Sequence, residues 1–171
     1  MLWLCIYLPL LPLEVFELSS QNDAADLDTT SLDTTSLDTT ALATIVVENQ
    51  KVLLANTHAK NKGIDTGLTT STARALSQEL IVIERDPNKE QQQLRTLAES
   101  LYCYSPDIIC YSNLREQHSL LLEIGRSLTL FNGVEAIQQQ IHHQFLNYST
   151  HTKGFTHRLA ISHTVKSAEL L

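Results

Sequence analysis

The sequence predicts an α+β domain in which helices cover one face of a sheet. Apolar runs of strand length alternate with amphipathic helical segments in the order β-α-loop-β-β-α-α-β-α-β-β-α-β-α, which is typical of α+β folds. The chain has 171 residues, of which 43% are hydrophobic and 18% charged. This composition is that of a globular protein with a sizeable core. The chain has only five Gly and four Pro. These counts argue against a fibrous or wholly disordered chain, because such chains are rich in both residues.

The first element is a short apolar run at residues 2–8, closed by Pro9. A run of this length without polar alternation predicts a central strand buried on both faces. Pro12 suits the first turn of a short helix over residues 13–18.

A repeat follows at residues 19–43, where the character of the chain changes. The motif Leu-Asp-Thr-Thr at residues 27–30 recurs at 32–35 and at 37–40. Its period of five residues fits neither a helix nor a strand, and its few apolar side chains cannot offset the entropy of ordering. We interpret this segment as a disordered, repeat-expanded insertion, with a phosphorylated tail as the alternative.

The remaining elements are marked by turn and capping signals. Asn49-Gln50 predicts a hairpin turn, Asp86-Pro87 a helix start, and Asn132 with Glu135 a capping box. Strands are expected over residues 44–48, 51–55, 80–83, 107–111, 119–124 and 157–162. Helices are expected over residues 56–62, 70–78, 87–104 and 134–145, and one more begins at residue 165.

Charge argues against a domain that grips DNA by itself. The formal net charge is −7 and the isoelectric point about 5.4. Duplex binding depends on neutralising phosphates and normally requires a basic surface. A self-sufficient polymerase is therefore disfavoured.

Cysteine usage and the first sixteen residues indicate a cytoplasmic protein. Cys5, Cys103 and Cys110 form neither a disulfide framework nor a zinc signature. The apolar start lacks a basic region and a cleavage site, so we expect neither export nor membrane association.

The histidines suggest no metal site. His142 and His143 point about 100° apart on a helix, which makes shared ligation of one ion difficult. His151, His157 and His163 have no regular ligand spacing.

Four segments, in order, carry a family resemblance. Residues 1–9 resemble the first palm strand of the Y-family (UmuC/DinB-like) DNA polymerases, and most closely that of the catalytically inactive ImuB-type homologues. Residues 54–67 are similar to the fingers motif of that family, and residues 120–133 to its apolar strand, acid-Ile-Gly turn and Leu-Phe-x-Gly run. Residues 158–162 look like a later palm strand.

This resemblance implies a ferredoxin-like palm with a small inserted fingers subdomain. The implied boundaries are residues 1–18 for the start of the palm, 19–43 for the insertion, 44–78 for the fingers and 79–171 for the rest of the palm. The thumb and little finger are expected to be absent, as in a fragment or a truncated reading frame.

The resemblance also indicates that the catalytic carboxylates are lost. In the family, three acids hold two divalent metal ions. The matching positions here are Tyr7, His118 and Ser119, so we expect no metal and no catalytic residue. Glu123 matches a family acid that is not a ligand, and we interpret it as structural.

The nucleotide-binding side is also altered. The Tyr and Arg that active relatives direct at the triphosphate correspond to Thr57 and Lys60 here, a vestige in which Lys60 offers only a point charge. A Lys near the chain end corresponds to Glu169, whose charge is wrong for phosphate.

The implied function is a non-catalytic adaptor in DNA repair, translesion synthesis and the SOS response. Its expected partners are a polymerase subunit, the sliding clamp and a recombinase, with damaged DNA contacted through C-terminal domains outside these residues. One alternative is an active, Mg²⁺-dependent Y-family DNA polymerase. The other is an unrelated α+β domain.

Overall fold

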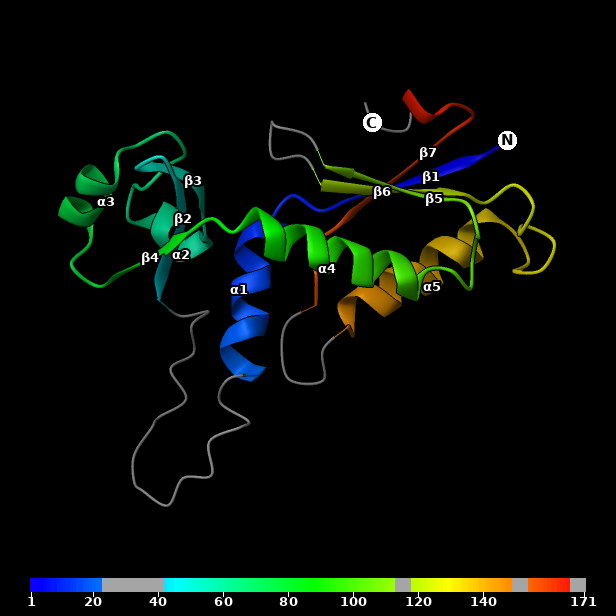
Figure 1. Ribbon diagram of the computed structural model, residues 1–171, viewed down its shortest axis with the longest axis horizontal. Helices are drawn as coiled ribbons and strands as arrows, with labels where there is room; N and C mark the ends of the chain where they lie inside the picture. The colour runs from blue at the N-terminus through cyan, green and yellow to red at the C-terminus, as the bar shows by residue number, and fades with distance from the viewer. Residues whose placement is uncertain (23–41, 113–117, 149–153, 167–171) are drawn as a thin grey trace, which may run out of the picture. The chain divides into compact units, whose positions relative to one another are not determined.

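The computed structural model describes residues 1–22, 42–112, 118–148 and 154–166 (Figure 1). The chain divides into two compact units. One consists of Met1–Leu11 with Asn88–Leu171, and the other of Pro12–Pro87. Among the described residues, no helix is both long and apolar enough to span a bilayer.

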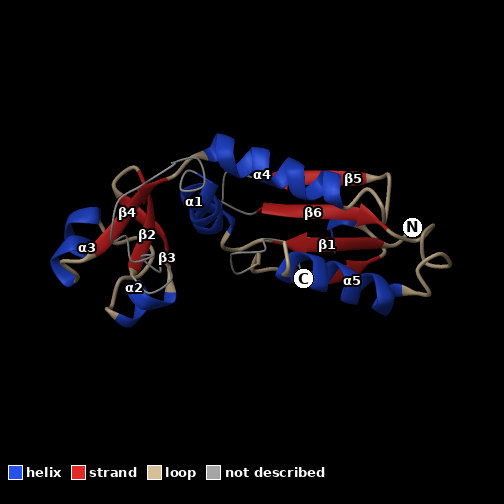
Figure 2. Ribbon diagram, turned by 90° about the horizontal axis from the view of Figure 1, so that it is seen from below, coloured by secondary structure: helices blue, strands red, loops and turns tan. Residues whose placement is uncertain are grey.

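The first unit contains an antiparallel sheet of four strands. These are β1 (Trp3–Tyr7), β5 (Ile108–Ser112), β6 (His118–Glu123) and β7 (Arg158–Ser162), in the order β5-β6-β1-β7. Helices α4 (Pro87–Ser100) and α5 (Val134–Leu146) lie on one face of this sheet (Figures 1 and 2). The order β1-α4-β5-β6-α5-β7 is the ferredoxin-like arrangement, so the predicted palm fold is confirmed.

Strand alternation divides the side chains of this sheet between two faces. Leu4, Ile6 and Leu8 of the first strand segment are fully buried. The helices supply apolar residues at helical spacing to the same core, namely Leu94, Leu97, Ile137, Ile141 and Phe145, and the buried Leu101 follows just after α4. The opposite face, called the outer face below, carries a smaller cluster built on Cys5 and Leu121.

The second unit contains a three-stranded sheet with three helices. Strands β2 (Ala43–Glu48), β3 (Lys51–Ala55) and β4 (Leu80–Glu84) have the order β3-β2-β4, in which β2 and β4 are parallel. Its helices are α1 (Leu11–Asn22), α2 (Thr57–Asn61) and α3 (Thr70–Leu76). The core includes Ile45, Val47, Val52, Ile64 and Ala73.

This unit is wider than the 44–78 range expected for the fingers. Residues 80–84 were expected in the palm, but β4 pairs with β2 along its whole length. Leu13 of α1 likewise packs against Val46 and Leu53. Both elements therefore belong to the smaller unit because their apolar residues are buried there.

The predicted hairpin between β2 and β3 is present. Glu48 pairs with Lys51, and both turn residues have positive φ, 50° for Asn49 and 62° for Gln50. Two consecutive left-handed residues give a turn whose twist matches that of the flanking strands.

The predicted capping box at the start of α5 is wrong. The N-cap is Gly133, and no side chain caps the helix. Asn132 has a φ of 60°, whereas an N-cap residue needs extended backbone.

Other boundaries differ modestly. Helix α1 continues to Asn22 rather than ending at Leu18, and α4 ends at Ser100 rather than near Tyr104. The five-residue repeat lies outside the described residues, as does most of the helix expected from Val165.

Candidate functional site

Tyr7 and Ser119 lie directly opposite each other on adjacent strands. Tyr7 is the last residue of β1 and pairs with Ser119 of β6 and with Arg158 of β7, while Ser119 also pairs with Tyr111 of β5. Directly paired residues point to the same face of a sheet. These four side chains therefore form one row across the outer face, away from α4 and α5.

His118 points to the opposite face. Its Nε2 lies 3.1 Å from Oε2 of Glu90 on α4, and both side chains are only 1% exposed. The backbone carbonyl of His118 accepts a hydrogen bond from the Leu8 amide at 2.8 Å, which fixes this end of β6 against β1. Because successive strand residues alternate in direction, Ser119 and His118 cannot face one site together here.

The side chains on the outer face do not fit a pair of Mg²⁺ ions. Hard divalent cations need several oxygen ligands, chiefly carboxylates. The row offers the phenols of Tyr7 and Tyr111, the hydroxyl of Ser119 and the cation of Arg158 instead. Within the described ranges, no three His, Cys, Asp or Glu residues gather where they could hold a metal.

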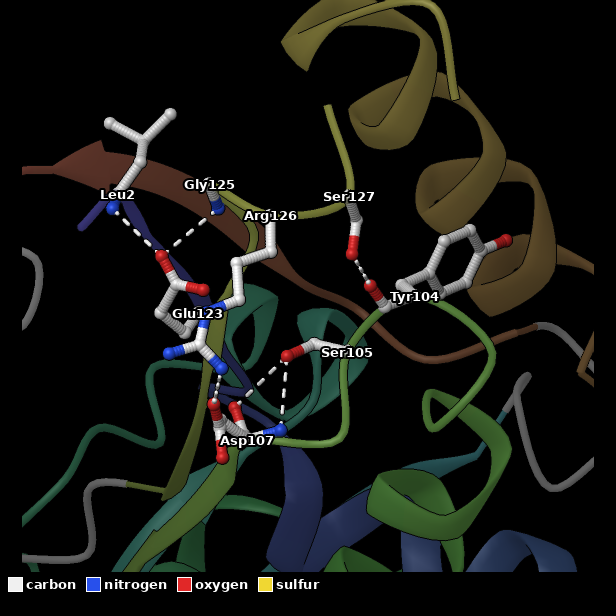
Figure 3. A network of polar contacts seen from close by, with 8 residues as sticks. All are labelled: Leu2, Tyr104, Ser105, Asp107, Glu123, Gly125, Arg126 and Ser127. Atoms are coloured by element: carbon white, nitrogen blue, oxygen red, sulfur yellow. Dashed lines mark hydrogen bonds and ion pairs between the residues drawn. The ribbon is translucent and has the colours of Figure 1, made fainter. Parts of the chain in front are cut away.

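The acid at the other end of β6 has a structural role (Figure 3). Oε1 of Glu123 accepts hydrogen bonds from the Leu2 amide at 3.2 Å and from the Gly125 amide at 3.1 Å. A Cβ atom added at Gly125 would lie 2.7 Å from that oxygen. Glu123 thus joins the chain start to the turn after β6, and glycine leaves room for its carboxylate.

Asp107 lies at the same end of the sheet, far along the strands from Tyr7. Its carboxylate is 3.7 Å from Arg126, and its amide donates to Oγ of Ser105 (Figure 3). Neither acid of this network therefore approaches the row that contains Tyr7.

Thr57 and Lys60 both lie on the exposed surface of α2, in the second unit. Asn56 positions this helix, since its Oδ1 accepts from the amides of Ala59 and Thr44 and its Nδ2 donates to the Leu42 carbonyl. Lys60 presents one ammonium group there and no bidentate fork.

Glu90 was missed by the sequence reasoning, although a signal existed. It precedes Leu94 by four residues and Leu97 by seven, and all three are buried on one face of α4. A carboxylate at this spacing predicts a buried acid, which needs a partner.

A contact between His142 and His157 was also missed. Nδ1 of His142 lies 2.8 Å from Nε2 of His157, whose Nδ1 lies 2.8 Å from the Phe155 carbonyl. Burial lowers the pKa of His157; its backbone hydrogen bond opposes this and His142 adds to it. The two residues are on α5 and before β7, so no local spacing indicates their meeting.

One family model matches this chain. The family model described as impB/mucB/samB matches residues 29–170. No curated protein sequence matches. The match covers most of the chain and rules out an unrelated α+β domain.

Solved structures resemble the chain in fold. A structure described as "Dbh Ternary Complex (substrates partially disordered)" has a TM-score of 0.66 and 13% identity, over 99% of this chain and 44% of that one. A structure described as "Post-insertion binary complex of Dbh DNA polymerase" has a TM-score of 0.66 and 14% identity, over 95% of this chain and 42% of that one. A structure described as "Crystal Structure of DinB from Sulfolobus solfataricus" has a TM-score of 0.62 and 12% identity, over 99% of this chain and 44% of that one.

The chain thus spans less than half the length of these structures. Its two units correspond to their palm and fingers region, as the sequence motifs predicted. The chain belongs to the impB/mucB/samB family and has the fold of the palm and fingers of a Y-family DNA polymerase.

Proposed function

We propose that this protein is a non-catalytic Y-family polymerase homologue that acts in the cytoplasm as an adaptor in DNA repair and translesion synthesis. One observation carries the proposal. The positions that match the family's metal ligands hold Tyr7 and Ser119 on the outer face, and His118 on the other face against Glu90.

The loss of activity has an electrostatic reason. Phosphoryl transfer uses two metal ions to polarise the attacking hydroxyl and to stabilise the leaving oxygens. Without carboxylates, the mutual repulsion of two dications and their desolvation are not offset. Neither a phenol nor a serine hydroxyl supplies the missing negative charge.

The nucleotide side and the overall charge support the same conclusion. Lys60 supplies a single ammonium group on an exposed helix, where solvent screens its interaction with a phosphate. The net charge of −7 disfavours strong autonomous DNA binding. The retained palm then serves as a shaped surface for other translesion proteins.

The proposed partners are a polymerase subunit, the sliding clamp and a recombinase. Damaged DNA is contacted mainly through regions that correspond to the remaining length of the Dbh and DinB structures. No metal cofactor is required for this role.

Primer extension and partner capture together test the proposal. The full-length protein should incorporate no nucleotide with Mg²⁺ or Mn²⁺, while it retains a sliding clamp and a recombinase filament in pull-down assays. The matched variant Tyr7→Ala/Ser119→Ala should give the same result as wild type in primer extension. Chelator-sensitive incorporation that this variant loses would establish the alternative, an active Mg²⁺-dependent polymerase. Absence of both incorporation and partner capture would refute the adaptor role.

A further inference from the structure

Among the strands that the structure describes, β5 is an edge strand whose own residues lack the usual protection against pairing. Sheet edges commonly carry charged residues that prevent association with another strand. The other edge strands follow this pattern, with Arg158 in β7, Lys51 in β3 and Glu84 in β4. The sequence of β5 is Ile-Ile-Cys-Tyr-Ser and contains no charge.

The backbone of β5 presents hydrogen-bonding groups outward. The Glu123 amide donates to the Asp107 carbonyl at 3.1 Å, which makes these two residues a hydrogen-bonded pair. In an antiparallel ladder such pairs occur at every second residue, so Ile109 also bonds to β6. Ile108 and Cys110 therefore direct their amides and carbonyls away from the sheet.

The side chains of the edge are accessible as well. Ile109 is 43% exposed and Tyr111 is 39% exposed. They are paired with Leu121 and Ser119, so both lie on the outer face. Cys110 is also exposed and lies on the face of α4.

We propose that β5 pairs with β5 of a second copy of this chain, antiparallel and across a two-fold axis. The register that pairs all five residues places the axis at Cys110, the midpoint of the strand. It then sets Ile109 opposite Tyr111 of the second copy, and Tyr111 opposite Ile109 of the second copy. The four-stranded sheet becomes a continuous sheet through both copies.

Self-complementarity favours a second copy over other occupants. Ile109 and Tyr111 form a non-hydrogen-bonded pair in this register, where side chains approach most closely and β-branched–aromatic pairs stabilise a sheet. A symmetric interface uses the same patch twice, and this strand meets that condition without an unpaired charge. Nucleic acid requires an extended basic surface, whereas β5 itself has no cation and Arg95 of α4 is the cation that acts on Cys110. The inference does not depend on whether the protein is catalytic.

Cysteine crosslinking tests the register. Hydrogen-bonded antiparallel pairs have Cα atoms about 5.5 Å apart, within disulfide range. Burial raises the pKa of the Cys110 thiol, and Arg95 partly opposes this. The reaction is therefore run at alkaline pH, where more of the thiol is the reactive thiolate. Copper–phenanthroline is the oxidant and accepts the two electrons released per disulfide. A covalent dimer is expected for wild type and for Cys103→Ser, and none for Cys110→Ser.

Sedimentation provides a readout independent of the thiols. In the full chain, Ile109→Lys and Tyr111→Lys should each weaken dimerisation by about tenfold or more, because an edge cation opposes strand pairing. The control Tyr102→Lys, at a residue 57% exposed outside β5, should dimerise like wild type. Circular dichroism checks that each variant is folded.

The proposal would be overturned by a chain that stays monomeric at about 100 μM, by a dimer unaffected by Ile109→Lys, or by a crosslink that requires Cys103. A monomer that binds a foreign peptide or single-stranded DNA along β5 would also overturn it, because the edge would then have another occupant.

Discussion

Two adjacent residues at the start of β6 have separate structural roles. Ser119 lies in the outer row with Tyr7, whereas His118 is buried against Glu90. Tyr7 and Ser119 were expected within strands, whereas His118 was expected just before the strand over residues 119–124 and is instead the first residue of β6. The sequence reasoning missed the buried acidic partner of His118, because the interpretation of α4 considered only its apolar residues.

At this scale, the buried pair predicts a large loss of stability on truncation. His118→Ala should lower the free energy of unfolding by about 2 kcal/mol or more, since it empties a buried site and removes the contact with the Glu90 carboxylate. The measurement is urea unfolding, with the exposed His58→Ala as control. Equal stability of the two variants would contradict the assigned role.

The carboxylate of Glu123 gives a second residue-scale prediction. Glu123→Ala should cost about 2–3 kcal/mol of unfolding free energy, because two backbone amides lose a charged acceptor. Glu123→Gln should cost less, because its amide oxygen still accepts hydrogen bonds. Urea unfolding curves of both variants check this order, and the reverse order would refute it.

Among the elements, those with strong local signals were predicted best. The hairpin at Asn49-Gln50 and the helix start at Pro87 follow from backbone preferences of a few residues. Errors occurred where a longer-range contact decides. Strand β4 joins β2 in a parallel pair whose partners are 37 residues apart, for which turn chemistry gives no signal.

The hairpin predicts that a glycine stabilises the second unit. Gln50 has a φ of 62°, a conformation that costs a non-glycine residue free energy. Gln50→Gly should therefore raise stability by about 0.5–1 kcal/mol in urea unfolding. Gln91→Gly, at an exposed position of α4, should instead lower it by about 1 kcal/mol. Destabilisation by Gln50→Gly would mean that the turn is not left-handed.

The contact between α5 and the start of β7 predicts a pH dependence. The pKa of His157 in the folded protein is lowered, chiefly by burial, whereas its pKa in the unfolded chain is about 6.5. Below that pH the unfolded chain binds more protons, so stability falls as pH decreases through this range.

Urea midpoints at about pH 7.5 and about pH 5.5 measure this effect. His157→Gln should show a smaller loss between the two values than wild type. The exposed His163→Gln should behave like wild type. An unchanged loss in His157→Gln would assign the pH dependence to other groups.

For the whole molecule, composition and motif order were sufficient for the fold. A sheet with helices on one face follows from the apolar strands and from two amphipathic helices with Leu94 and Ile141 in their buried stripes, whereas the ferredoxin-like palm was implied by the family resemblance. The boundary between the units did not follow, because it depends on where Leu13 and β4 are buried. The family motifs predicted which positions lack carboxylates, and packing determines where their replacements point.

The central claim is that the outer face cannot hold two divalent metal ions. Electron paramagnetic resonance of Mn²⁺ titrated into the full chain tests this directly, because bound and free Mn²⁺ give distinct signals. The account predicts no specific binding to wild type and measurable binding to Tyr7→Asp/Ser119→Glu, which restores two facing carboxylates. Two Mn²⁺ ions bound to wild type, and lost in Tyr7→Ala/Ser119→Ala, would contradict it.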